Sequence, residues 1–209
     1  MMRPNSKKVF DSKVIKDFDA LLFDMDGTLI DSMPAHNRAW QMALAEFGVT
    51  VSNDELLELA GTPNKRTAEI FIDRYSILST AETIVRAKEE LFERAINNID
   101  LIQSVATIAQ SFFNQKALGL VSGSDRQSIH RNLRLFQLEH LFSCIVSSGD
   151  TVLGKPSPDP YLLAAQLLKV EPHRCLVFED GHAGILSAKQ AGMNVILIEN
   201  GLLYHWESK

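Results

Sequence analysis

Five short apolar runs constrain the fold of this chain more than any other feature of its sequence. Each run is continuous and does not alternate with polar residues, which is typical of strands buried on both faces of a parallel sheet. Helical patterns lie between most of the runs, and this alternation predicts an α/β fold with a doubly wound parallel sheet. The runs occupy residues 20–24, 117–122, 143–148, 175–180 and 195–198.

A serine followed three positions later by Glu or Gln indicates the start of a helix, because the two residues can cap the first turn reciprocally. Ser52, Ser79 and Ser124 all show this spacing. We therefore expect helices to begin at these three serines. Two more helical patterns, over residues 158–168 and 182–191, separate the later apolar runs.

The segment between the first two apolar runs has no strand signal. Four helical patterns fill it, over residues 34–47, 53–60, 65–75 and 81–97. Such a series of helices predicts a helical subdomain of residues 32–98, inserted into a core that residues 1–31 and 99–209 form.

The composition argues against several classes of partner. The 209 residues include 21 Lys and Arg against 26 Asp and Glu, which gives a net charge of −5. Proteins that bind nucleic acids or anionic membranes usually have a basic surplus, so we expect neither partner. No apolar stretch approaches the ~18 residues of a membrane span, and no apolar region follows the basic residues 1–13 as it would in a signal peptide. We expect a monomeric, cytoplasmic protein whose two widely spaced cysteines are reduced.

Acidic and small polar residues follow four of the apolar runs, where the strands are expected to end. Ligands of an open α/β sheet bind at the carboxyl ends of its strands. This edge of the sheet should therefore collect residues 24–28, 122–124, 154–156 and 179–181.

The carboxylates at this edge need a positive partner. Like charges about 4 Å apart repel by about 4 kcal/mol at an effective dielectric near 20, so four clustered carboxylates require shared protons or a cation. Mg²⁺ usually takes one or two carboxylates, water and a substrate phosphate, and Asp24 with Asp180 fits that ligand set. Lys155 and Ser122 would then bind the phosphate, as a point charge and a neutral donor.

These segments resemble, in order and separation, the four motifs of the haloacid dehalogenase (HAD) superfamily of phosphoryl-transfer enzymes. They read DMDGT, LVSGS, GKPSPDPYL and FEDGHAGILSAKQAGM, and the resemblance covers essentially the whole chain. The helical insert resembles the helical cap of that superfamily. The segment from His36 to Trp40 and the GTPNKR loop resemble the subgroup of β-phosphoglucomutases and sugar-phosphate phosphatases. The resemblance implies a Rossmann-like core, Mg²⁺ as cofactor and a small phosphorylated metabolite as substrate.

The resemblance also implies roles for individual acidic residues. Asp24 would attack phosphorus and form an aspartyl-phosphate. Asp26 would act as general acid and base, oriented by a hydrogen bond from Thr28. Asp24, Asp180 and the backbone carbonyl of Asp26 would ligate Mg²⁺, and Glu179 would hold metal-bound water.

The remaining expected contacts to substrate follow from the same resemblance. The transferring phosphoryl group would be bound by Thr28, Ser122, the Gly123 amide and Lys155. In the cap, the residues expected to contact the rest of the substrate are His36, Lys65, Arg66 and Lys88.

Differences within the superfamily favour a phosphatase. Asp26 argues against a dehalogenase, which needs no general acid for an alcohol leaving group. A β-phosphoglucomutase of this subgroup has an arginine three residues after the cap-loop glycine, whereas here Asn64 stands at that distance from Gly61 and the arginine is Arg66. We therefore expect a phosphoric monoester hydrolase acting on fructose 1-phosphate or similar sugar phosphates.

Two alternatives remain open at this point. One is a β-phosphoglucomutase that interconverts β-glucose 1-phosphate and glucose 6-phosphate. The other is a non-enzymatic phospho-receiver domain, which also uses an aspartate at a strand end, Mg²⁺ and a lysine. The helical insert argues against the second alternative, because lids sequester small substrates.

Overall fold

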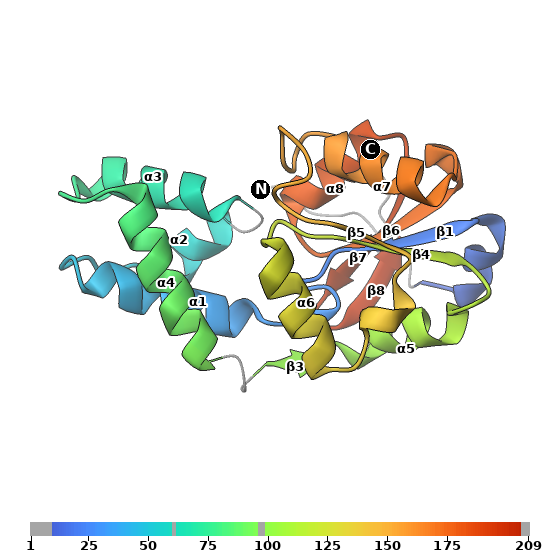
Figure 1. Cartoon of the computed structure of the whole chain (residues 1–209), viewed down its shortest axis with the longest axis horizontal. Coiled ribbons are helices and arrows are strands. Elements are labelled where there is room, and N and C mark those ends of the chain that lie inside the picture. The colour runs from blue at the N-terminus through green and yellow to red at the C-terminus, as the bar shows by residue number, and fades with distance from the viewer. Residues whose placement is uncertain (1–9, 60–61, 96–98, 206–209) are drawn as a thin grey trace.

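A six-stranded sheet lies at the centre of the larger part of the molecule, and the computed structural model describes residues 10–59, 62–95 and 99–205 (Figure 1). The strand order is β5-β4-β1-β6-β7-β8. The first five strands of this order are parallel, and β8 pairs with β7 in the antiparallel direction. The predicted α/β fold class is therefore confirmed. The strands are β1 Ala20–Phe23, β4 Ala117–Val121, β5 Cys144–Val146, β6 Cys175–Glu179, β7 Asn194–Glu199 and β8 Leu202–His205.

Helices cover both faces of the sheet, which explains why the strand sequences are apolar without alternation. One set of alternate β1 side chains packs in a core with α5 and α6, and the other set packs in a second core with α7 and α8. Figure 1 shows α7 and α8 above the sheet and α5 below it. These helices are α5 Gln103–Phe112, α6 Arg126–Leu135, α7 Asp159–Leu168 and α8 His182–Gln190.

Four further helices gather to one side of the sheet (Figure 1) and pack around the buried side chains of Trp40, Phe71 and Ile84. A short antiparallel pair, β2 (Ile30–Asp31) with β3 (Asp100–Leu101), joins the two chain crossings between the sheet and these helices. Because the pair lies at the crossings, we propose a division into a core of residues 1–31 and 99–209 and a cap of residues 32–98. The cap helices are α1 Met33–Ala45, α2 Asn53–Glu58, α3 Asn64–Tyr75 and α4 Ala81–Ala95.

The predicted helix starts agree with the structure at one position of three. Ser52 forms the predicted capping box at α2. At α4, Thr80 and not Ser79 accepts the hydrogen bond from the first-turn amide, so that prediction is one residue early. At α6, Asp125 and not Ser124 is the capping residue, because the Ser124 hydroxyl is engaged at the carboxyl edge of the sheet. None of the helices in the described part of the chain is long and apolar enough to cross a membrane.

Both ends of the described chain pack against the core. Residues Ser12–Asp17 form a 3-10 helix whose Ile15 side chain is fully buried in the core, although the pattern of this segment is polar. At the other end, Asn200 and Gly201 both have positive φ, which lets β8 fold back on β7 as a tight hairpin. The Asn-Gly pair is a local hairpin signal that our sequence analysis does not use. Residues 206–209 lie outside the described part.

Candidate active site

The carboxyl ends of β1, β4 and β6 meet at one edge of the sheet, facing the cap. The register aligns Phe23 with Leu120 and with Phe178, so the residues that follow these strands come together. A pocket lies between this edge and the cap, and both contribute to its walls. Its lining includes Asp24, Asp26, Gly123, Lys155, Glu179 and Asp180 from the core.

Lys155 links two of the carboxylates. Its Nζ lies 2.6 Å from Asp24 Oδ1 and 2.6 Å from Glu179 Oε1, and it also donates to the Val121 carbonyl at 3.0 Å. The ammonium group stands over the Tyr161 ring, 5.0 Å from its centroid. Burial lowers the pKa of Lys155, but Asp24 and Glu179 together raise that pKa well above its usual value. The residue is therefore a charged lysine held between two acids.

The acidic residues at this edge have a donor set that fits a divalent cation. Asp24, Glu179 and Asp180 each offer an oxygen, and these oxygens lie within 4.8 Å of one another. Burial raises the pKa of Asp24 well above its usual value, and the charges of Glu179 and Asp180 add to the shift while Lys155 opposes it. Burial and Glu179 raise the pKa of Asp180 to about 7. One lysine does not balance three carboxylates, and hard oxygen ligands in this number fit Mg²⁺.

Two glycines allow these carboxylates to lie close to the backbone. Gly27 has a φ of +84°, and a Cβ atom there would lie 2.2 Å from Asp180 Oδ2. A Cβ atom on Gly184 would lie 1.6 Å from Glu179 Oε1. Side chains at either position would displace an acid of the cluster. The sequence analysis does not single out Gly184, for which the only signal is its place in the motif that follows β6.

Thr28 contacts a different acid from the one expected. Its side chain is fully buried, and Oγ1 donates to Asp180 Oδ1 at 2.8 Å. The predicted hydrogen bond from Thr28 to Asp26 is therefore wrong, and Thr28 does not line the pocket. The tight turn after β1 directs the Thr28 hydroxyl towards β6, so Thr28 holds Asp180 in place.

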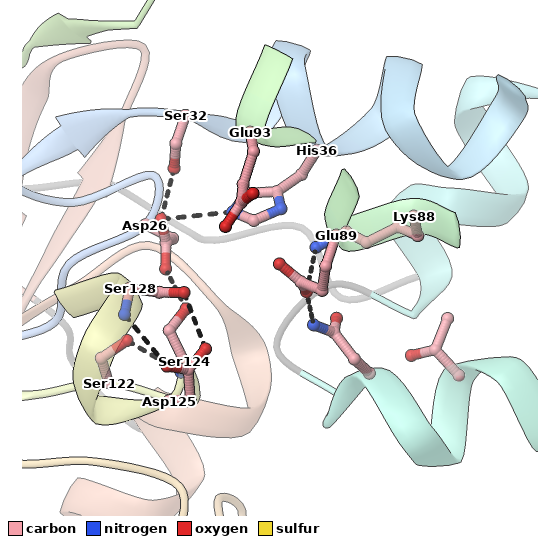
Figure 2. A network of polar contacts seen from close by, with 12 residues as sticks. Asp26, Ser32, His36, Lys88, Glu89, Glu93, Ser122, Ser124, Asp125 and Ser128 are labelled. Atoms are coloured by element: carbon pink, nitrogen blue, oxygen red, sulfur yellow. Dashed lines mark hydrogen bonds and ion pairs between the residues drawn. The ribbon is translucent and has the colours of Figure 1, made fainter. Parts of the chain in front are cut away.

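Three other side chains surround Asp26 (Figure 2). Ser32 Oγ donates to Oδ1 at 2.5 Å, His36 Nε2 lies 3.4 Å from the same oxygen, and Ser124 Oγ donates to Oδ2 at 2.9 Å. Burial raises the pKa of Asp26, but His36 and the two serine hydroxyls outweigh that effect and bring the pKa well below its usual value. Asp26 is therefore an ionised acceptor in this state, and two of its partners, Ser32 and His36, come from the cap.

The loop after β4 places backbone and hydroxyl groups beside the pocket. Ser122 is buried, and its Oγ accepts the Ser124 N–H at 3.0 Å. Nothing lies within 4 Å of the position that a Cβ atom would take on Gly123, so the backbone there is open to a ligand. Ser122 does not itself line the pocket, whereas Ser124 does. The sequence analysis assigns Ser124 to a helix cap and misses this place, because its capping pattern is the stronger local signal.

Two of the expected cap residues lie at or beside the pocket. His36 lines it, and its ring stacks on Phe92 with centroids 3.9 Å apart and planes 6° apart. Lys88 is fully buried behind the wall, where its Nζ donates to Glu89 Oε1 at 2.9 Å and lies 5.1 Å from the Phe92 ring centroid. The ion pair and the ring satisfy Lys88, which does not line the pocket.

The other two expected cap residues point to solvent. Lys65 pairs with Glu82 at 2.8 Å and Arg66 pairs with Glu69 at 3.1 Å, and both cationic side chains are more than half exposed. The structure does not bring them to the pocket. The residues of this turn that line the pocket are Asn64 and Thr67, because residues three apart lie on the same face of a helix, whereas successive residues point in directions about 100° apart.

Comparison with known proteins places these features in a family. Residues 21–198 match the family model described as haloacid dehalogenase-like hydrolase. An uncharacterized protein of Haemophilus influenzae is 32% identical over 188 residues, which cover 90% of this chain and 94% of that protein. Fructose-1-phosphate phosphatase YqaB of Escherichia coli is 29% identical over 181 residues, which cover 86% of this chain and 95% of that protein.

A solved structure shares the whole arrangement. The crystal structure of CbbY from Rhodobacter sphaeroides in complex with phosphate is similar with a TM-score of 0.79 and 27% sequence identity. The similarity covers 88% of this chain and 87% of that one. The match extends over both the sheet and the inserted helices, which is the arrangement that forms the pocket.

Proposed function

Because the chain belongs to the haloacid dehalogenase-like hydrolases, we propose that it is a Mg²⁺-dependent phosphatase of small phosphorylated sugars such as fructose 1-phosphate. One observation carries the proposal. Asp24 and Asp26 line the same pocket with different partners. Asp24 contacts the buried Lys155 and lies with Glu179 and Asp180 in a cluster that could hold a metal ion, whereas Asp26 is surrounded by the side chains of Ser32, His36 and Ser124. These different surroundings suit two carboxyl groups that have separate catalytic roles.

In this proposal Asp24 is the nucleophile. Lys155 engages its Oδ1, which leaves Oδ2 to attack phosphorus while the bond from phosphorus to the sugar oxygen breaks. Lys155 and the open backbone of Gly123 stabilise the charge on the equatorial oxygens of the transferring group. The product of this step is an aspartyl-phosphate on Asp24 and a free sugar hydroxyl.

Asp26 is the general acid and base. The dianionic phosphate adds negative charge beside Asp26 and raises its pKa, so that Asp26 carries a proton for the leaving oxygen. Once the sugar has left, the ionised Asp26 takes a proton from the water that attacks the aspartyl-phosphate. Ser32, His36 and Ser124 hold the Asp26 carboxylate in the position for both transfers.

Mg²⁺ fits the carboxyl edge in this scheme. Asp24, Asp180 and the backbone carbonyl of Asp26 would hold it, and Glu179 would contact one of its waters. When bound, Mg²⁺ supplies positive charge that offsets the repulsion between the carboxylates and the substrate phosphate. Thr28 keeps Asp180 in place for this role through its 2.8 Å hydrogen bond.

The relatives support the substrate class. The E. coli relative with 29% identity is named a fructose-1-phosphate phosphatase, and another relative with 29% identity, from Thermotoga maritima, is named a phosphorylated carbohydrates phosphatase. A mutase must also hold a second phosphate while an intermediate turns over. Asn64 stands where the β-phosphoglucomutases of this subgroup have arginine, which favours the phosphatase.

A phosphate-release screen over hexose, pentose and triose phosphates with Mg²⁺ tests the function. We expect release from hexose monophosphates, with p-nitrophenyl phosphate as a general reporter of activity. Conversion of β-glucose 1-phosphate to glucose 6-phosphate without phosphate release would favour the mutase instead. Failure to hydrolyse any ester with Mg²⁺ would overturn the proposal.

Variants of the two aspartates separate the enzyme from a phospho-receiver. With p-nitrophenyl phosphate, whose leaving group needs no acid, Asp26→Asn should form the aspartyl-phosphate and accumulate it, because no base activates water. Asp24→Asn should form none. If Asp26→Asn turns over like the wild type, the role of Asp26 is wrong.

A further inference from the structure

The described cap residues that line the pocket include no lysine, arginine, aspartate or glutamate. Among the described residues that line it, the formal charges of Asp24, Asp26, Lys155, Glu179 and Asp180 all come from the core. The polar groups that the cap contributes are amides, hydroxyls and the His36 ring, whose Nε2 faces Asp26. The end of a substrate that lies against the cap therefore meets no lysine or arginine in the described part of the wall.

The basic residues near the wall are already paired. Lys65 and Arg66 point to solvent with their own acidic partners. Lys88 is buried behind the wall, and Glu89 balances its charge at 2.9 Å. Because Lys88 cannot reach the pocket without leaving that acid and the two rings beside it, its ammonium group does not bind an anionic substrate group directly.

Glu89 also determines how Asn64 is oriented. Asn64 Nδ2 donates to Glu89 Oε1 at 2.6 Å. The same oxygen accepts from Lys88, and Figure 2 shows Lys88 and Glu89 side by side. Because Glu89 Oε1 accepts hydrogen bonds from both the Lys88 ammonium and the Asn64 amide, the amide nitrogen, and not the amide oxygen, faces it. The Oδ1 end of Asn64 is therefore directed away from Glu89 and is available to a ligand in the pocket that Asn64 lines.

We infer that Asn64, oriented by the Glu89–Lys88 pair, is a specificity-determining residue that accepts a hydrogen bond from a hydroxyl of a neutral, polyhydroxylated leaving group and excludes leaving groups with a second anion. This inference rests on the proposed phosphatase function and narrows its substrate class. A carboxylate or second phosphate at this place would face the Asn64 acceptor, and the described cap residues that line the pocket include no lysine or arginine to balance its charge. A site that pairs a hydroxyl but leaves an anionic group of the substrate uncompensated discriminates between such substrates.

A matched pair of substrates tests the inference. Sorbitol 6-phosphate and 6-phosphogluconate differ only at the far carbon, which carries a hydroxymethyl group in the first and a carboxylate in the second. We expect kcat/KM with Mg²⁺ to be about 100-fold higher for sorbitol 6-phosphate. Fructose 1-phosphate and fructose 1,6-bisphosphate form a second pair. For this pair we expect kcat/KM to be higher for fructose 1-phosphate, which lacks the second phosphate.

Two variants connect the preference to the residues. Asn64→Leu removes the acceptor, and Glu89→Gln keeps a partner for Lys88 but lets the Asn64 amide turn. Both should reduce the ratio between sorbitol 6-phosphate and 6-phosphogluconate to less than about tenfold, through a lower kcat/KM for the sorbitol ester. Glu90→Gln, at the next and exposed position of α4, is the control and should leave the ratio unchanged.

The possible outcomes distinguish a failure of this inference from a failure of the proposed phosphatase function. If p-nitrophenyl phosphate and both members of each pair are not hydrolysed, the phosphatase function is wrong. If wild-type protein hydrolyses the neutral and the acidic ester of each pair equally well, the function stands and the inference is overturned. If the preference exists but neither variant changes it, the assignment to Asn64 is overturned. Circular dichroism of each variant establishes that it is folded before its kinetics are compared.

Discussion

Replacing Lys155 with methionine tests what holds the carboxyl edge together. The substitution keeps the length of the side chain but removes a buried charge that lies 2.6 Å from both Asp24 Oδ1 and Glu179 Oε1. At that distance each attraction amounts to about 6 kcal/mol at an effective dielectric of about 20, and desolvation of the ammonium offsets several kcal/mol. Loss of one member of a buried ion pair costs about 3–5 kcal/mol. We expect the free energy of unfolding at pH 7.5 to fall by that amount.

The loss should depend on pH in a defined direction. The pKa of Asp24 is already raised by burial and by neighbouring acids, and Lys155 opposes the shift, so its removal raises that pKa further. A carboxyl group with a raised pKa in the folded state binds its proton more tightly there. Stability therefore falls as the pH rises from the unfolded pKa, about 3.9, towards the folded one. The destabilisation should be smaller at pH 5 than at pH 7.5.

Urea unfolding followed by circular dichroism at both pH values measures these differences. Lys65→Met is the matched control, because Lys65 is exposed and has a single partner, Glu82, so its unfolding midpoint should hardly change. If Lys155→Met unfolds at the wild-type midpoint at pH 7.5, or loses as much stability at pH 5, the electrostatic reasoning is refuted.

Three further changes test other parts of the site. Gly184→Ala places a Cβ 1.6 Å from the present position of Glu179 Oε1 and should lower the free energy of unfolding by about 1–3 kcal/mol; an unchanged urea midpoint would contradict the geometry. Arg131→Gln breaks the 2.8 Å ion pair with Glu93 that joins α6 of the core to α4 of the cap, so KM should rise while stability falls by no more than about 1 kcal/mol, and Glu93→Gln should raise KM equally. Mg²⁺ should raise the thermal unfolding midpoint more at pH 8 than at pH 6. The pKa of Asp180 is about 7, and a carboxyl group must lose its proton before it can bind a metal ion. Equal shifts of the midpoint at the two pH values, measured by calorimetry, would count against the metal site.

The carboxyl edge is predictable from the sequence because its causes are local and repetitive. Strands buried on both faces have continuous apolar sequences, and parallel strands end at one edge. The residues at the carboxyl ends of β1 and β6 must therefore lie near one another, as Asp24, Glu179 and Asp180 do. The sequence also contains the Asn200-Gly201 hairpin signal, so the place of β8 is local information as well.

Hydrogen-bond partners within the edge are not predictable in this way. Thr28 donates to Asp180 and not to Asp26, and Ser124 donates to Asp26 although its spacing is that of a helix cap. A motif places a residue along the chain, but its rotamer depends on atoms from distant segments. For Ser124, the alternative acceptor on Asp26 is 98 positions away in sequence.

The cap shows the same limit more strongly. Basic residues in the cap predict contacts to the substrate, yet Lys65 and Arg66 turn to solvent while the adjacent Asn64 lines the pocket. The spacing of Lys88 with Ile84 and Phe92 is consistent with its burial in α4, but that spacing does not indicate that Lys88 pairs with Glu89. By itself, the sequence determined the α/β core, the inserted helices and the acids of the carboxyl edge, because periodicity and strand order encode them. Only the tertiary structure decided which side chains face the substrate, because that depends on helix rotation and on contacts between segments far apart in the chain.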